Sequence, residues 1–179
     1  MYDCCLETDG ACAVIVGAST DVKRAAGNAV VVSVADDRPE TPDDLSNRPD
    51  LLAIGLDAAA KRVWEAAGVG PDEMDGAMIY DCFTFEVIHQ LESAGFVEPG
   101  AGGRFAEEGN IDLGGKLPVN THGGLLSEGH MSGLNHVVEA VRQLRGEAKG
   151  RQIDNARHIA VTGWGDLGDG SMAVLERGR

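Results

Sequence analysis

Three short segments of the sequence carry side chains suited to acid–base chemistry. In the first, Tyr80–Thr84, Tyr80 ends a predicted strand and Cys82 begins a predicted helix. Unpaired N–H groups and the dipole at a helix N-terminus favour a thiolate, and a neighbouring phenol can hydrogen-bond a carbonyl oxygen. The alternative is structural, with Cys82 as a small buried side chain and Tyr80 closing a strand.

The second segment, Asn120–Gly124, combines a glycine pair with polar side chains. Gly123 and Gly124 allow the backbone to approach a ligand closely. Asn120 and His122 add hydrogen-bond donors and acceptors. The segment therefore fits a substrate-binding loop, and a tight turn with polar side chains is the alternative.

The third segment, 127–136, holds His130 between glycines at the entrance to a predicted helix. The ordinary pKa of histidine lies near neutrality, which makes His130 a natural proton carrier. His136 lies further along the same helix, and we expect it to be structural or at the surface. A zinc site of His122, His130 and His136 is a weaker alternative, because there is no nearby cysteine pair and no i, i+4 spacing.

Composition limits the classes of function. The 179 residues include 29 acidic and 15 basic ones, a net charge of −14, which argues against nucleic acid or an anionic membrane as a partner. No apolar run approaches the roughly 18 residues of a membrane span, and no signal peptide is visible. The four cysteines form no CxxC framework. We therefore expect a cytoplasmic protein with reduced thiols.

The elements that must position these segments follow from hydrophobic periodicity. Strands and helices alternate, which predicts a layered α/β domain with a largely parallel sheet. The region 98–115 is expected to be irregular. The predicted strands cover 29–35, 77–80, 116–120, 158–162 and 171–175, and the predicted helices cover 51–67, 82–94 and about 134–144.

The two ends of the chain share one pattern. Asp9–Val16 and Asp169–Leu175 both run from Asp-Gly through small residues into aliphatic ones, as a turn followed by a strand does. A repeat of this kind indicates two similar half-domains. Residues 1–27 are then the last strand of a missing first half plus a linker, and 28–179 are a complete domain. Chance similarity in a sequence rich in glycine and alanine is the alternative.

Taken together, these motifs resemble the C-terminal half of the thiolase superfamily, in its sterol-carrier and lipid-transfer branch. Tyr80–Phe83 (Tyr-Asp-Cys-Phe) stands where that branch has His-Asp-Cys-Phe, and a leading tyrosine is similar to the steroid side-chain aldolases. Gly129–Gly133 resembles the thiolase Gly-His-Pro-x-Gly motif with Met131 in place of proline, and Asn120–Gly124 resembles Asn-x-x-Gly-Gly. The chain departs from thiolases at Thr162–Gly165, where their Cys-x-Gly motif has no counterpart.

The resemblance implies a thiolase-like α/β half-domain (βαβαβαββ) with layered helices and a mixed sheet. It also implies action on acyl-CoA thioesters, with formation or cleavage of a carbon–carbon bond, and a retro-aldol lyase is favoured over an acyltransferase. The nucleophilic cysteine of true thiolases belongs to the first half, which this chain lacks, and steroid-type aldolases lack it as well.

By the same resemblance, the catalytic residues are Tyr80, Cys82 and His130, and the substrate-binding residues are Asn120, His122, Gly123 and Gly124. It implies no bound metal or cofactor, with coenzyme A present only as part of the substrate. It also implies a homo-oligomer or a partner subunit, for which an OB-fold/zinc-ribbon protein is a candidate. The alternative is a non-catalytic lipid or acyl-CoA binding protein, or a truncated subunit that needs a partner chain.

Overall fold

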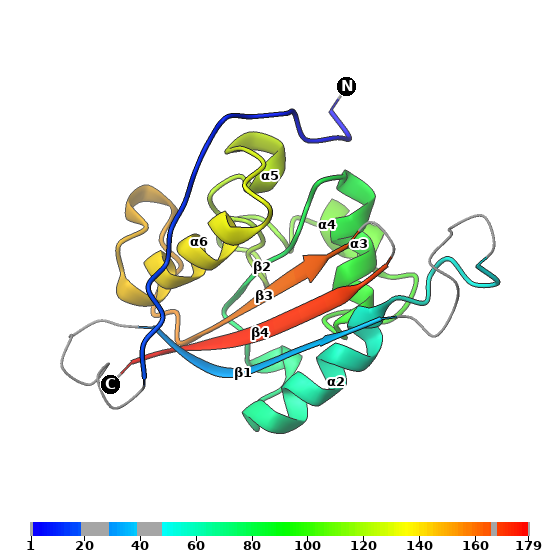
Figure 1. The fold of residues 1–179 in the computed structure, drawn as a ribbon, viewed down its shortest axis with the longest axis horizontal. Coiled ribbons are helices and arrows are strands. Elements are labelled where there is room, and N and C mark those ends of the chain that lie inside the picture. Colours follow the sequence, from blue (N-terminus) through cyan, green and yellow to red (C-terminus); the bar gives the residue numbers. More distant parts are fainter. Residues whose placement is uncertain (1, 19–28, 39–47, 166–167, 179) are drawn as a thin grey trace.

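The computed structural model describes residues 2–18, 29–38, 48–165 and 168–178, and its centre is a four-stranded sheet in the order β1-β4-β3-β2 (Figure 1). β1 and β3 both pair antiparallel with β4, whereas β2 pairs parallel with β3. The strands are β1 (Ala29–Asp37), β2 (Gly76–Met78), β3 (His158–Trp164) and β4 (Gly170–Arg177).

The expectation of a largely parallel sheet was therefore wrong, and the mixed sheet implied by the family resemblance is confirmed. The reason lies in the connection between β3 and β4. Only residues 165–169 separate these strands, and a link of that length can join antiparallel neighbours but cannot cross over a sheet.

The three long helices occur where the periodicity predicts them: α2 (Gly55–Ala67), α3 (Thr84–Ser93) and α6 (Leu134–Arg145). α2 begins later than predicted and leaves Leu51 and Leu52 exposed before it. α3 begins at Thr84 after the N-cap Phe83, so the prediction that Cys82 opens this helix was wrong. The short elements are α4 (Gly102–Glu107), α5 (Gly124–Ser127), η2 (Pro71–Glu73) and η3 (Lys149–Arg151).

Each face of the sheet carries its own hydrophobic core, because successive strand residues point to opposite faces. On β4, Met172 and Val174 pack in the core with α2 and α3, whereas Leu175 packs in the second core with α6. On β3, Ala160 belongs to the first core and Ile159 to the second. α2 and α6 therefore cover opposite faces, and the ends of β2 and β3 lie between the layers (Figure 1).

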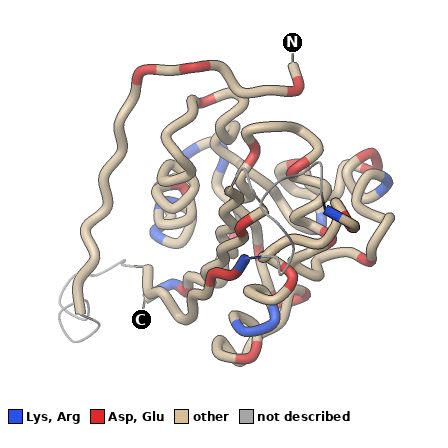
Figure 2. The backbone as a smooth tube through the Cα atoms, turned by 45° about the vertical axis from the view of Figure 1, so that its right-hand side comes forward, with Lys and Arg blue, Asp and Glu red and all other residues tan. Residues whose placement is uncertain are grey.

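Within the first described segment, residues 5–18 have no secondary structure and run in an extended path outside α5 and α6 (Figures 1 and 2). The strand predicted over Asp9–Val16 is therefore not formed. A strand needs a neighbour to pair with, and among the described residues none pairs with this stretch. Ile15 and Val16 have relative exposures of 102% and 84%. The predicted strand over 116–120 is likewise only a single bridge, between Ala77 and Val119.

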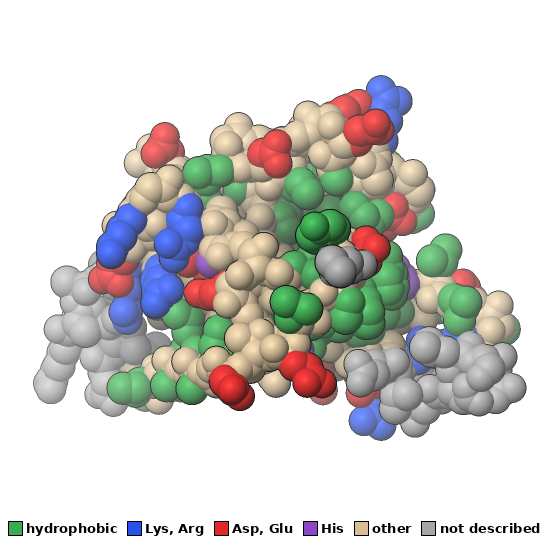
Figure 3. Space-filling model, turned by 90° about the horizontal axis from the view of Figure 1, so that it is seen from above, with side chains coloured by type: hydrophobic (Ala, Val, Ile, Leu, Met, Phe, Trp, Pro, Cys, Tyr) green, Lys and Arg blue, Asp and Glu red, His purple; other side chains and the backbone are tan. Residues whose placement is uncertain are grey.

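Apolar surface stays open beside this segment. A groove of about 740 Å³ is lined by Val14 and Ile15 on one side and by β1 and α6 residues, including Val31 and Val138, on the other. Val31 and Val34 of β1 are exposed to 54% and 71%. Figure 3 shows hydrophobic side chains gathered on the face seen from above, with acidic side chains around them. Among the described residues, no helix is long and apolar enough to cross a membrane.

Two glycines set the distance between α2 and the sheet. A Cβ on Gly170 would collide with the backbone of Leu56, and a Cβ on Gly55 would collide with the carbonyl oxygen of Asp37. Backbone atoms cannot yield as a flexible side chain can. The first turn of α2 therefore lies directly on the ends of β1 and β4.

We expect Gly170→Ala to lower the free energy of unfolding by about 1–3 kcal/mol, because the added methyl group forces α2 away from the sheet. Denaturant unfolding followed by circular dichroism measures the change. The matched control is Gly103→Ala in α4, where a Cβ meets nothing within 4 Å. Equal stability of the two variants would contradict the argument.

Candidate active site

The loop that follows β2 is fixed by two amide side chains, the buried Gln90 and the half-buried Asn120. Gln90 of α3 donates its Nε2 to the carbonyl oxygen of Tyr80 at 2.7 Å, and Thr162 of β3 donates its hydroxyl to Gln90 Oε1 at 2.7 Å. Asn120 bonds Ile79 twice, since its Oδ1 accepts from the Ile79 N–H at 2.7 Å and its Nδ2 donates to the Ile79 carbonyl at 2.8 Å. The backbone that carries Tyr80 is therefore held from both sides.

Tyr80 and His130, predicted separately from two distant motifs, are in direct contact. The Tyr80 hydroxyl lies 2.9 Å from His130 Nε2, and both residues are half-buried. A Cβ on Gly133, whose φ is +78°, would lie 3.0 Å from Tyr80 Cδ2, so the phenol ring packs closely on the backbone before α6. A phenol that contacts an imidazole can pass a proton to it or receive one.

Cys82 has a different neighbour from the one expected. Its thiol donates to Glu86 Oε2 at 3.1 Å, and Glu86 is only 3% exposed. The Cys82 thiol therefore lies beside a buried carboxyl group of α3, and Cys82 precedes this helix rather than opening it. Glu86 was not predicted, because a glutamate in the first turn of a helix gives no signal that it is buried.

The Asn120–Gly124 loop is held by polar contacts rather than left open. Asn120 has a left-handed φ of +48°, and both polar atoms of its side chain bond Ile79. A Cβ on Gly124 would collide with the Asp81 carboxylate, so only glycine fits there. Asp81 Oδ1 accepts the Leu125 N–H at 2.7 Å, which ties α5 to the loop after β2.

His122 and His136 form a second contact that the sequence did not predict. His122 Nε2 lies 3.0 Å from His136 Nδ1, and His136 Nε2 lies 3.2 Å from Asp81 Oδ1. The expectation for His136 is refined, since it lies in the first turn of α6 and is fully buried. Burial, and secondly the neighbouring His136, lowers the pKa of His122 to about 4.

The two pairs account for all three histidines of the alternative zinc site. His122 contacts His136, while His130 contacts Tyr80. In the part of the chain that the structure describes, no three His, Cys, Asp or Glu side chains are grouped to hold a metal ion.

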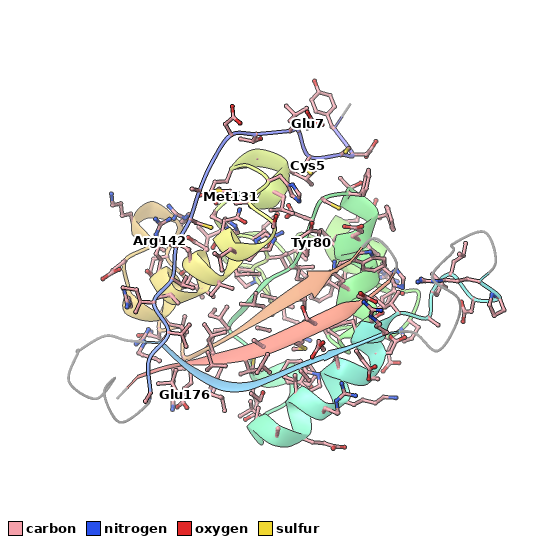
Figure 4. All side chains as sticks on the ribbon, in the orientation of Figure 1. Cys5, Glu7, Tyr80, Met131, Arg142 and Glu176 are labelled. Carbon is pink, nitrogen blue, oxygen red and sulfur yellow. The ribbon has the colours of Figure 1, made fainter. Side chains whose placement is uncertain are left out.

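The N-terminal segment passes over this region. Cys4 forms an antiparallel bridge with Phe83, and the Cys5 N–H donates to the Cys82 carbonyl at 2.9 Å. A Cβ on Gly10 would lie 3.2 Å from Met131 Sδ, so the segment also contacts the loop beside His130. Figure 4 shows Cys5 and Met131 on the same side of the molecule as Tyr80.

Comparison with known proteins agrees with this fold and with the family that the motifs resemble. Residues 40–177 match the family described as "Thiolase C-terminal domain-like". A 17-hydroxy-3-oxo-4-pregnene-20-carboxyl-CoA lyase of Mycobacterium tuberculosis is 35% identical over 90% of this chain and 43% of its own length. A steroid side-chain-cleaving aldolase of Thermomonospora curvata is 32% identical over 99% of this chain and 46% of its own.

The solved structure of a Ltp2-ChsH2(DUF35) aldolase superimposes with a TM-score of 0.79 at 30% identity, over 87% of this chain and 41% of that one. The chain thus spans less than half the length of these relatives. The comparisons confirm the branch that the Tyr-Asp-Cys-Phe motif indicated. With the family description matched over residues 40–177 and the fold shared, the chain belongs to the thiolase C-terminal domain-like family.

Proposed function

We propose that this chain is the C-terminal part of an enzyme that cleaves a carbon–carbon bond of an acyl-CoA thioester by retro-aldol chemistry. The observation that carries the proposal is the 2.9 Å contact between the Tyr80 hydroxyl and His130 Nε2. The names of the two sequence relatives, a lyase and an aldolase, support the same reaction class. No bound cofactor is proposed, and coenzyme A enters only as part of the substrate.

In the proposed reaction, the substrate is a β-hydroxyacyl thioester. The Tyr80–His130 pair takes the proton of the hydroxyl group on the β-carbon, and the β-carbon becomes a carbonyl carbon. The bond between the α- and β-carbons breaks, and its electron pair forms the enolate of the remaining thioester. The same pair then returns a proton to the α-carbon. Cys82 is an alternate acid/base in this scheme.

The loop of Asn120, His122, Gly123 and Gly124 is proposed to orient the thioester. Because both polar atoms of the Asn120 side chain already bond Ile79, Asn120 contributes by holding the loop. The tight backbone at Gly123, with φ of +98°, suits a close approach to a ligand.

The proposed assembly includes a second half-domain or a partner subunit. Residues 1–27 are proposed as the last strand of the first half with its linker, and residues 28–179 as the complete domain. The open groove beside α6 and the exposed Ile15 and Val16 support a missing neighbour. An OB-fold/zinc-ribbon partner is proposed from family resemblance. The four free thiols and an acyl-CoA substrate fit the cytoplasm.

We expect Tyr80→Phe to lower kcat by about 10² or more, because the variant keeps the ring packing but cannot carry the proton. The assay follows cleavage of 17-hydroxy-3-oxo-4-pregnene-20-carboxyl-CoA by the chain in its natural assembly. Tyr2→Phe is the matched control, since Tyr2 is 88% exposed. Full turnover by Tyr80→Phe would remove Tyr80 from the mechanism, and binding of the thioester without cleavage by the wild type would favour a binding protein.

A second substitution tests Cys82. We expect Cys82→Ala to reduce kcat by less than about tenfold, because its thiol faces Glu86 and an alternate acid/base adds less than the main proton carrier. Cys12→Ala is the control for the loss of a thiol. A loss as large as that of Tyr80→Phe would exchange the two roles and make Cys82 the principal acid/base.

A further inference from the structure

We propose that Asp81, His136 and His122 are positioning residues that form one buried chain of contacts and fix a single tautomer of both histidines. The chain locks the Asn120–Gly124 loop against the segment that carries Tyr80. Its effect on turnover rests on the function proposed above, whereas the tautomers can be measured without any activity.

The chain begins at a carboxylate whose described hydrogen-bonding neighbours are donors. Asp81 Oδ1 accepts the Leu125 N–H at 2.7 Å, and Oδ2 faces the Leu126 N–H at 3.4 Å. His136 Nε2 lies 3.2 Å from Oδ1, close enough for an N–H group to face the carboxylate although the two are not aligned as a hydrogen bond. Because an ionised carboxylate only accepts, His136 Nε2 is the nitrogen that carries the proton.

The hydrogen bond between His136 and His122 then has only one possible donor. A neutral His136 protonated at Nε2 has a bare lone pair at Nδ1, which lies 3.0 Å from His122 Nε2. His122 must therefore be protonated at Nε2 and bare at Nδ1. Its Nδ1 is buried and has no hydrogen-bond partner among the described residues.

A charged His136 is the competing arrangement. It would donate from Nδ1 to His122 and force the proton of His122 onto Nδ1, where no described acceptor lies. The charged arrangement leaves two buried N–H groups without an aligned acceptor among the described residues, at His122 Nδ1 and His136 Nε2, whereas the neutral arrangement leaves only His136 Nε2, which faces Asp81 Oδ1 at 3.2 Å. Because buried N–H groups without a partner are rare in proteins, the neutral arrangement is preferred.

Burial and the neighbouring His136 keep His122 neutral, whereas the carboxylates around it favour the charged ring. Those carboxylates belong to Glu128 after α5, Glu139 on α6 and Asp81 after β2. Arg151 takes both oxygens of Glu139, at 2.9 and 2.7 Å, and Glu128 Oε2 stays 3.8 Å from His122 Nε2. The carboxylates therefore oppose the effect of burial on the pKa of His122 without outweighing it.

The link to the site is direct. Asp81 follows Tyr80 in the chain, and the rings of Tyr80 and His136 meet edge to face with centroids 6.3 Å apart. A rotation of His136 would move the surface against which Tyr80 packs, and with it the Tyr80–His130 contact.

The lowered pKa of His122, about 4 against an ordinary 6.5, predicts a pH effect on stability. Between those values the unfolded chain binds the proton and the folded chain does not, so the unfolding free energy falls as the pH is lowered through this window. We expect unfolding to take up about one more proton near pH 5 in the wild type than in His122→Asn. Denaturation midpoints across this pH range measure it, and equal slopes would contradict a neutral buried His122.

The decisive experiment is nitrogen-15 NMR of the histidine rings in the full chain, with any subunit that purifies with it. We expect His122 and His136 each to be protonated at Nε2 and bare at Nδ1. A proton on Nδ1 of either ring, or an average of two tautomers, would overturn the proposal.

Variants of His136 then test positioning. Gln at this position offers a donor and an acceptor, so His136→Gln should keep the His122 tautomer and kcat within about threefold. His136→Leu offers neither, so His122 should no longer be held in one tautomer and the His130 Nε2 signal should change. We expect kcat to fall at least tenfold with little change in KM. His158→Leu is the matched control.

An unchanged His130 signal in a folded His136→Leu variant would overturn the positioning role. If His136→Leu does not fold, the wild-type tautomers and the His136→Gln variant still decide. A protein with the expected tautomers but no lyase activity would refute the proposed function alone.

Discussion

The buried carboxylate of Asp81 is the contact on which the site depends. It stands between Tyr80 and Cys82 in the chain, accepts the N–H at the start of α5 and faces His136 in the first turn of α6. Leu125 and His136, which lie 44 and 55 positions further along the chain, thus meet at the Asp81 carboxylate. Burying a charge is costly unless donors surround it, so the sequence must supply all of these partners together.

Around that group the polar side chains are arranged in two layers. Tyr80, Cys82 and His130 are half-buried, while Glu86, Gln90, His136 and Glu139 are almost fully enclosed. The enclosed groups contact the half-buried ones: Gln90 donates to the Tyr80 carbonyl and Glu86 accepts from the Cys82 thiol. The half-buried groups are consequently held in place, and little of their geometry depends on solvent.

The apolar patterns predicted the strands around 29–35, 77–80, 158–162 and 171–175, which are short apolar runs, and the three long helices, each of which has one apolar face. It could not predict which strands pair, since pairing depends on the length and path of the connections. The motifs predicted that Tyr80 and His130 matter, and the fold brings them together. Glu86 and the His122–His136 contact had no sequence signal, because side chains from separate elements meet only after folding. The strand predicted over Asp9–Val16 is not formed, because a sequence pattern indicates a preference for strand conformation but does not supply a neighbouring strand to pair with.

The path of the N-terminal segment has a thermodynamic consequence for assembly. The backbone of Cys4 and Cys5 pairs with the segment that follows Tyr80, whereas Val14 and Ile15 line the groove near α6. One stretch of about ten residues therefore joins the two places. A tether of that length keeps its aliphatic end at a high local concentration near the groove. Any chain that fills the groove must either compete with this end or pair with it. Binding of such a chain in the groove and ordering of the N-terminal segment over the site therefore influence each other, as reciprocal linkage requires.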